Sequence, residues 1–320
     1  MINVMPVVYA CKNKNENIRR QSTSGGVFSV MATEVLNQGG AVFAVRFNEK
    51  FEPVYDFIES VLDIDRFRGS KYVQAIISSK MIFDLKSRLK NGQKVMIVGT
   101  PCTINGFARM LKQYRNQLLL VDFVCMGIAS LKIWNEYLKQ AFNQYDIQKI
   151  TFKDKSTGWR NYSFSVQTDK GMITEHGKKN LYMQGYLNKL YLRPSCYNCA
   201  CKGLNRDSDL TIADCWGIED EYPDFDDDGG ISSVFINSQK GKDYFEKFQE
   251  HIEFVQLSFD TATRKNHYYF DSAEKNYYRD DFFKVYSKNP SIDTMEKFRY
   301  KTRPIWIKVI NKIVAKINHQ

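Results

Sequence analysis

Apolar runs alternate with amphipathic stretches along the first half of the chain. Val7–Ala10 and Ala41–Phe47 are short segments rich in valine and aromatic residues, which is typical of strands. Between them, apolar residues recur at helical spacing over Gly25–Asn37, and two glycines follow directly. The pattern therefore predicts a strand, a helix and a second strand.

The same order continues further along the chain. A helix that includes Met81–Leu89 is predicted, followed by a short buried strand at Lys94–Val98, a turn at Gly99 and Thr100, and another helix. Leu118–Val124 is the most apolar predicted strand. This succession is typical of α/β folds, which bind ligands at the carboxyl ends of their strands.

From about residue 149 the pattern changes to antiparallel β-structure. Ile150–Lys153, Tyr162–Thr168 and Gly171–Glu175 predict a β-rich insertion, and Leu210–Ala213 and Ile231–Asn237 return to a strand pattern. We therefore expect an α/β protein with α+β elements: a mixed sheet flanked by helices, a β-rich insertion and a helical C-terminal tail. The expected segments are an α/β domain at 1–148, a β-rich segment with a cysteine cluster at 149–256 that packs on it, and a mostly helical basic region at 257–320.

Composition and charge narrow the class of protein. Hydrophobic residues make up 43% of the 320 residues, which is enough to bury a core. No apolar run reaches the roughly 18 residues of a membrane span, and the N-terminus does not resemble a secretory signal. We therefore expect a cytoplasmic protein.

The net charge of +10 is concentrated at the C-terminus, where seven Lys or Arg and no acid lie between Lys297 and Gln320. We expect Arg299–Gln320 to make a peripheral contact with an anionic membrane or a partner protein, or to dock on the chain itself. Nucleic-acid binding is not expected, because no groove-reading motif accompanies the charge.

Cysteines are the main candidates for chemistry. In the expected compartment the seven cysteines should be thiols or metal ligands rather than disulfides. Cys196 and Cys199 form a CxxC pair, Cys102 begins a helix after a strand, and Cys125 follows the most apolar strand. If all four meet at the carboxyl edge of the sheet, they form a complete thiolate ligand set. The alternative is that they are unliganded thiols.

Three polar segments are candidate cofactor contacts. Gln21–Gly26 places hydroxyl groups and two glycines at the start of a helix, where backbone amides can bind a pyrophosphate. The alternative for Ser24 is an ordinary N-cap. Arg68–Gln74 and Lys153–Trp159 contribute cations and aromatic rings, although a charged loop and a hairpin rim are their ordinary interpretations.

Together these segments resemble the coenzyme F-420 hydrogenase/dehydrogenase beta-subunit family. The resemblance extends from about Val7 to Asn237 and rests on seven motifs in the order typical of the family. They are RQSTSGGVF (20–28), RGSKYVQ (68–74), VGTPC (98–102), VDFVCMG (121–127), FKDKSTGW (152–159), LRPSCYNC (192–199) and DLTIADCWG (209–217).

The resemblance implies an iron–sulfur flavoprotein that binds FAD beside a 4Fe–4S cluster and passes electrons to a deazaflavin or another organic acceptor. Carried over residue by residue, it implies cluster ligation by Cys102, Cys125, Cys196 and Cys199. The implied flavin contacts are Ser24, Gly25, Gly26, Lys71, Gln74, Gly99 and Thr100, and Lys71 or Lys153 near the ring would favour the anionic reduced flavin.

The sequence also departs from the family pattern. Many relatives begin with a ferredoxin-like segment, whereas only Cys11 precedes Cys102 here, so we expect electrons from a separate protein such as a ferredoxin. Met126 stands where relatives commonly have His, which puts a proton-handling role there in doubt. Cys201 and Cys215 stand where Phe is usual, so either could replace an implied ligand.

The expected function is that of an oxidoreductase acting on an organic small molecule. Similarity to short relatives encoded with bacterial surface-polysaccharide genes favours a redox step on a sugar or sugar nucleotide. The alternative is a non-catalytic member that serves as a scaffold in a polysaccharide-assembly complex.

Overall fold

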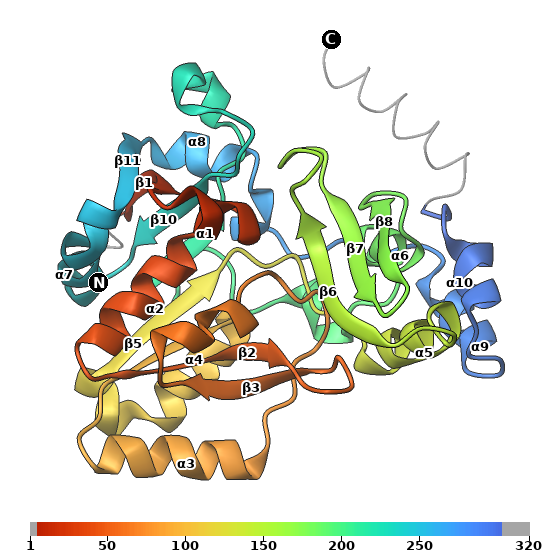
Figure 1. The fold of residues 1–320 in the computed structure, drawn as a ribbon, viewed down its shortest axis with the longest axis horizontal. Coiled ribbons are helices and arrows are strands. Elements are labelled where there is room, and N and C mark those ends of the chain that lie inside the picture. The colour runs from red at the N-terminus through yellow and green to blue at the C-terminus, as the bar shows by residue number, and fades with distance from the viewer. Residues whose placement is uncertain (1–4, 303–320) are drawn as a thin grey trace.

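An eight-stranded mixed sheet forms the larger part of the computed structural model, which describes residues 5–302. Figure 1 shows this sheet, and the order of its strands is β11-β1-β10-β9-β5-β4-β2-β3. The central strands β2, β4, β5 and β9 are parallel, and the strands on either side pair antiparallel. The bounds are β1 Val7–Asn13, β2 Ala41–Phe47, β3 Pro53–Ile58, β4 Val95–Gly99, β5 Leu118–Phe123, β9 Leu210–Asp214, β10 Ser232–Ile236 and β11 Ile252–Leu257.

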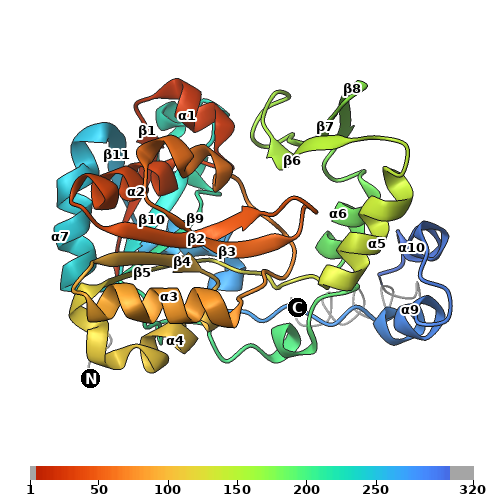
Figure 2. The ribbon, with the colours of Figure 1, turned by 60° about the horizontal axis from the view of Figure 1, so that its bottom comes forward.

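Helices cover both faces of the parallel strands, which explains why these strands are mostly apolar and β4 is apolar along its whole length. In β4, Met96 and Val98 pack toward α2 (Val27–Asn37) and α7 (Gln239–Phe248). The alternate residues Val95 and Ile97 pack toward α3 (Ser79–Lys90) and α4 (Pro101–Met110). Figure 2 shows α2 above the sheet and α3 and α4 below it. The short helices α1 (Glu16–Gln21) and α8 (Phe259–Arg264) complete this large lobe.

A small lobe lies beside the sheet (Figure 1). It contains the antiparallel sheet of β6 (Ile147–Asp154), β7 (Ser163–Thr168) and β8 (Gly171–His176), together with α5 (Leu131–Ala141), α6 (Leu181–Leu187), α9 (Arg279–Tyr286) and α10 (Ile292–Phe298). Its core is aromatic: the ring of Trp134 lies 4.7 Å from that of Tyr182 and 5.1 Å from that of Phe152. The same core contains Phe282 of α9 and Phe298 of α10, so it joins helices near the end of the described chain to the middle of the chain.

The predicted α/β class is confirmed, with a mixed sheet flanked by helices, an inserted small sheet and a helical C-terminal region. The two sheets do not follow the three expected segments, because β9 and β10 lie within 149–256 but pair inside the large sheet. The division into 1–148, 149–256 and 257–320 stays a prediction. Most of the predicted basic tail, residues 303–320, lies outside the described residues. Within 5–302, no helix has both the length and the apolar character needed to cross a membrane.

Two lysines at the end of β6 connect the small lobe to the large lobe. Lys153 Nζ lies 2.6 Å from Asp214 Oδ2, at the end of β9. Lys155 Nζ donates hydrogen bonds of 2.7, 2.8 and 2.7 Å to the backbone carbonyl oxygens of Arg19, Ser24 and Gly229. Three carbonyl groups, from α1, from the turn before α2 and from the turn before β10, therefore share one ammonium group.

Replacing Lys155 by methionine should lower the free energy of unfolding by about 2 kcal/mol, because three carbonyl oxygens lose a charged donor. Urea unfolding measures this loss, and hydrogen exchange should become faster in the turn before α2. Lys170→Met is the matched control, since Lys170 Nζ donates only to the carbonyl of Gln144 at an exposed site. Equal losses in the two variants would contradict a tethering role for Lys155.

Candidate functional site

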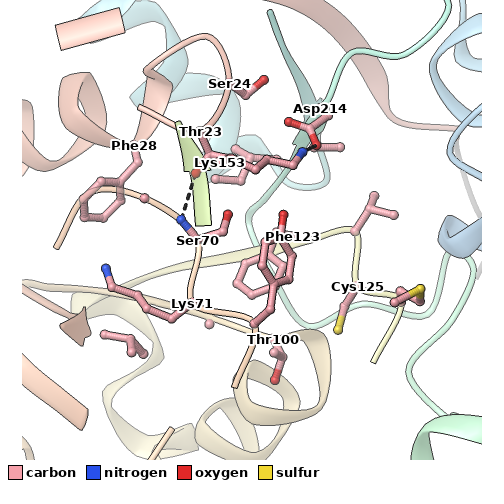
Figure 3. Close-up of a pocket in the computed structure, with 18 of the residues that line it drawn as sticks. Thr23, Ser24, Phe28, Ser70, Lys71, Thr100, Phe123, Cys125, Lys153 and Asp214 are labelled. Carbon is pink, nitrogen blue, oxygen red and sulfur yellow. Dashed lines mark hydrogen bonds and ion pairs between the residues drawn. The ribbon is translucent and has the colours of Figure 1, made fainter. Parts of the chain in front are cut away.

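A cavity of about 1020 Å³ lies between the two lobes, at the carboxyl ends of the parallel strands (Figure 3). Gly99 and Thr100 line it at the end of β4, Cys125 after β5, and Asp214 at the end of β9. This is the edge at which α/β sheets bind ligands. The volume reaches the upper end of the usual range for small-molecule pockets, roughly 300–1,000 Å³.

The turn before α2 forms one wall of the cavity. Ser24 and Gly26 line it, and Gly26 has a φ of 80°, a left-handed conformation that glycine adopts without strain. Gly26, not Ser24, is the N-cap of α2, so the N-cap alternative for Ser24 is wrong; the Ser24 hydroxyl donates to the carbonyl of Ile231.

Gly25 is the one implied flavin contact that does not line the cavity. It packs behind the turn, where its amide donates to Ser232 Oγ at 2.9 Å. A Cβ at Gly25 would lie 2.2 Å from the carbonyl oxygen of Cys11, so glycine is needed for this close approach to β1. Its role in the structure is therefore to let the turn pack on the sheet.

The loop that contains Lys71 and Gln74 forms the adjacent wall. The amide of Ser70 donates to Thr23 Oγ1 at 2.8 Å, which joins this loop to the turn before α2 (Figure 3). Lys71 Nζ donates to the carbonyl oxygens of Phe67 and Arg68 at 2.7 and 3.0 Å. Burial lowers the pKa of Lys71 to about 7, so this amine can gain or lose a proton near neutral pH.

Lys153 lines the cavity from the small lobe. Burial by itself lowers the pKa of Lys153, but the ion pair with Asp214 outweighs that effect and the net pKa is raised, so the ammonium stays charged. Among the described residues that line the cavity, Asp214 is the single acid, and the basic residues are Arg68, Lys71, Lys153, Arg160, Lys178 and Arg193. This excess of positive charge favours an anionic ligand.

A second, smaller hollow of about 30 Å³ is lined by cysteines. All four implied cluster ligands line it, and Cys201 joins them; the set is Cys102, Cys125, Cys196, Cys199 and Cys201. They come from the start of α4, the segment after β5, and the chain that begins at the 3₁₀ turn Pro194–Asn198. All are free thiols.

Backbone and side-chain contacts hold these thiols in place. The amide of Ile128 donates to Cys196 Sγ at 3.4 Å, and Thr100 Oγ1 lies 3.2 Å from Cys102 Sγ. Burial raises the pKa of the Cys125 thiol to about 12, which outweighs the opposing effect of the nearby Lys202 ammonium. The metal-free thiol is therefore protonated, and metal binding would release that proton.

The thiols that line the hollow are soft donors of the kind that an iron–sulfur cluster uses. Across residues 5–302, no three His, Cys, Asp or Glu side chains are grouped so that they could hold a metal ion. Zinc draws its sulfur ligands to about 2.3 Å, whereas a cubane cluster distributes four thiolates over four iron atoms. Five thiols around one hollow supply more than the four soft ligands that such a cluster needs.

The structure distinguishes Cys201 from Cys215, the two additional cysteines that the sequence treated alike as possible ligands. Cys201 lines the thiol hollow. Cys215 is fully buried and packs in an apolar cluster with Phe235 and Tyr269, and it lines neither cavity. Met126, which replaces the usual His, lines both.

Sequence reasoning gave no role to several residues that line the cavity. Asp214 and Trp216 lie within the DLTIADCWG motif, but nothing in the motif identifies Asp214 as the partner of Lys153. The ring of Trp216 stacks on the buried Trp159 with centroids 4.3 Å apart and planes 10° from parallel. Lys178 carries no sequence signal, because it is one of many exposed lysines.

The fold and the two adjoining hollows define an α/β protein with a large ligand cavity beside a cluster of thiols. Two family models, which describe the N-terminal and the C-terminal parts of the coenzyme F420 hydrogenase/dehydrogenase beta subunit, match residues 8–82 and 92–259 respectively. The chain belongs to this family of oxidoreductase subunits, as the motifs predicted.

Two known proteins are similar to this chain. The F subunit of the F(420)H(2) dehydrogenase from Methanosarcina mazei is 26% identical over 244 residues, which is 73% of this chain and 61% of that protein. The chain thus spans about three fifths of the length of that relative. A chain of the F420-reducing NiFe hydrogenase complex from Methanosarcina barkeri superposes with a TM-score of 0.55 and 17% identity, covering 84% of this chain and 92% of that one. This second likeness shows the fold alone.

The lowered pKa of Lys71 predicts a specific pH dependence of stability. The folded-state pKa of about 7 lies below the value of about 10.4 for an unfolded chain, so burial of the ammonium costs stability at low pH. That cost decreases as the pH rises from about 7 to about 10. The free energy of unfolding of the wild type should therefore rise relative to that of Lys71→Met, by at most about 1.4 kcal/mol per pH unit.

Urea unfolding of both proteins at several pH values measures this difference. The comparison cancels the contributions of the other titrating groups that the two proteins share. Parallel pH profiles for the wild type and Lys71→Met would contradict a desolvated amine at this position.

Proposed function

We propose that this protein is an iron–sulfur flavoprotein oxidoreductase that passes electrons between a 4Fe–4S cluster, FAD and an organic substrate or a deazaflavin. One observation carries the proposal: the large cavity and the thiol hollow share a wall. Cys125, Met126, Gly127, Ile128 and Tyr268 line both spaces. A cofactor in the cavity and a group on the thiols would thus be separated by a single layer of residues.

The shared wall supports electron exchange between the two cofactors. A flavin accepts a hydride or two electrons and an iron–sulfur cluster transfers one at a time, so the pair converts one mode into the other. The segment after β5 keeps the separation between the two cofactors short. Cys125 follows β5 by two residues, and the residues up to Ile128 continue along the cavity. Gly127 keeps this wall thin, since a Cβ there would lie 2.7 Å from Leu192 Cδ1 and 3.5 Å from Cys196 Sγ.

The cavity wall offers suitable groups for FAD. We propose that the turn at Ser24 and Gly26 and the turn at Gly99 and Thr100 contact the anionic part of the cofactor, because both lie at helix starts. Gly25 supports the first turn from behind. Lys71, Gln74 and Lys153 are the proposed contacts to the ring system, and either lysine would stabilise an anionic reduced flavin.

The proposed ligands of the cluster are Cys102, Cys125, Cys196 and Cys199. A separate electron-donor protein such as a ferredoxin is the proposed partner, which agrees with the naming of one relative as a subunit and of the other as part of a complex. We propose a cytoplasmic role in surface-polysaccharide biosynthesis, with a sugar or sugar nucleotide as substrate. The basic cavity wall suits the phosphate groups of a sugar nucleotide.

Anaerobic purification tests the proposed cofactors. The wild type should be brown, contain about four irons per chain and releasable FAD, and bleach with dithionite. Cys125→Ala should lose most of the iron, because Cys125 is a proposed ligand on the shared wall. Cys215→Ala, a change in the apolar core at a residue that lines neither hollow, should keep its iron. A colourless wild type that resists reconstitution with iron, sulfide and FAD would contradict the proposal and favour a scaffold.

Lys71→Ala tests the proposed flavin contact. Loss of the amine should slow flavin reduction and lower the flavin midpoint potential, because the anionic reduced ring loses a cation. Lys71→Arg, which keeps a positive charge, should retain much of the wild-type behaviour. Spectroelectrochemical titration and far-ultraviolet circular dichroism separate this effect from misfolding. Unchanged reduction in folded Lys71→Ala would refute the contact.

A further inference from the structure

The thiol hollow contains five sulfurs, whereas a cubane cluster uses four. We propose that Cys201 is a reserve ligand of the cluster site, which takes the position of Cys199 when the bond between Cys199 and iron breaks or when residue 199 has no sulfur. This inference rests on the proposed function, because it requires that the hollow holds an iron–sulfur cluster. It goes beyond the four-cysteine ligand set and assigns a role to a thiol outside it.

The residues next to Cys201 hold it at the hollow. Lys202 Nζ donates to the carbonyl oxygens of Cys125 and Tyr268 at 2.6 and 2.7 Å. The amide of Gly203 donates to the carbonyl of Tyr269 at 2.8 Å. The Lys202 side chain and the Gly203 amide thus attach the chain directly after Cys201 to the shared wall and to the segment that follows α8. These bonds explain why a thiol outside the implied ligand set lines the hollow.

Cys199 is the ligand that Cys201 can replace with the least movement. One residue separates the two, so their Cα atoms are at most about 7 Å apart. Residues 199–201 belong to no helix or strand, and Cys199 has extended backbone angles (φ −81°, ψ 119°). A change of rotamers and of a few backbone angles in this short segment can bring the Cys201 sulfur to the position of Cys199.

The other thiols are less exchangeable. Cys125 is part of the wall shared with the large cavity. Cys196 accepts a hydrogen bond from the amide of Ile128, and its sulfur would be 3.5 Å from a Cβ at Gly127, so it is packed against that wall. Cys102 is at the start of α4, where the helix fixes its backbone. Its segment contributes no second thiol to the hollow.

The exchange is a ligand substitution without electron transfer. The Cys201 thiol loses its proton as its sulfur forms a bond to iron. The Fe–S bond to Cys199 breaks, and the Cys199 sulfur takes up a proton. One thiolate thus replaces another, and the charge of the site and the oxidation state of the iron are unchanged.

The test compares Cys199→Ala, Cys201→Ala and the double variant with the wild type and with Cys215→Ala. Alanine is used because a serine oxygen could itself bind iron. Each full-length protein is reconstituted anaerobically with ferrous iron and sulfide. Iron and acid-labile sulfide per chain are measured, the reduced proteins are examined by electron paramagnetic resonance, and circular dichroism checks the fold.

Cys201→Ala and Cys215→Ala should match the wild type. Cys199→Ala should retain at least about threefold more iron than the double variant, with a changed resonance spectrum, because Cys201 completes the four-thiolate set. Equal iron loss in Cys199→Ala and the double variant would overturn the inference while the proposed function stands. Loss of iron in Cys201→Ala with retention in Cys199→Ala would also overturn it. A wild type that takes up no iron would overturn the proposed function and this inference together.

A measurement on the wild type does not depend on how well the variants fold. In the cluster-loaded protein a reserve thiol is free, so iodoacetamide should alkylate Cys201 and leave Cys199 protected. Tandem mass spectrometry can locate the alkylated residue. After the cluster is removed by chelation under anaerobic conditions, both residues should be alkylated. Protection of Cys201 in the loaded wild type would show that it is already a ligand and would overturn its reserve role.

Discussion

The ion pair between Lys153 and Asp214 is the contact on which the cavity depends. Lys153 comes from the small sheet and Asp214 from the end of β9, so one short bond joins the two lobes across the space between them. Both side chains are largely buried, with 7% and 19% of their surfaces exposed, and an unpaired charge there would be costly. Lys155 reinforces the connection through three backbone carbonyl groups.

The carboxyl edge of the parallel strands determines where chemistry can occur. β4 ends at the Gly99–Thr100 turn, β5 leads into the wall that begins at Cys125, and β9 ends at Asp214. Parallel pairing of these three strands brings segments far apart in the sequence to one edge. The large cavity and the thiol hollow therefore lie on either side of the segment after β5, and their adjacency follows directly from the topology.

Sequence patterns identified most strands of the large sheet but missed β3 and β11. The strand predicted at Ala41–Phe47 has those bounds in β2, because its apolar run is buried between helices. β11 was not predicted: it is an edge strand with exposed Glu253 and Gln256, so its composition resembles that of a loop. β9 and β10 were predicted as strands, but their short sequences do not specify which sheet they join, since pairing partners are non-local.

The sequence by itself determined the family, the α/β class and four of the five cysteines that line one hollow, because each depends on local motifs or on residues at strand ends. Only the tertiary structure decided that Gly25 packs behind the cavity, that Asp214 pairs with Lys153, and that Cys201 lines the hollow while Cys215 is in the core. These distinctions depend on which side of a turn or strand a side chain faces, and on partners more than 50 residues away in the chain. Local hydrophobic periodicity does not carry that information.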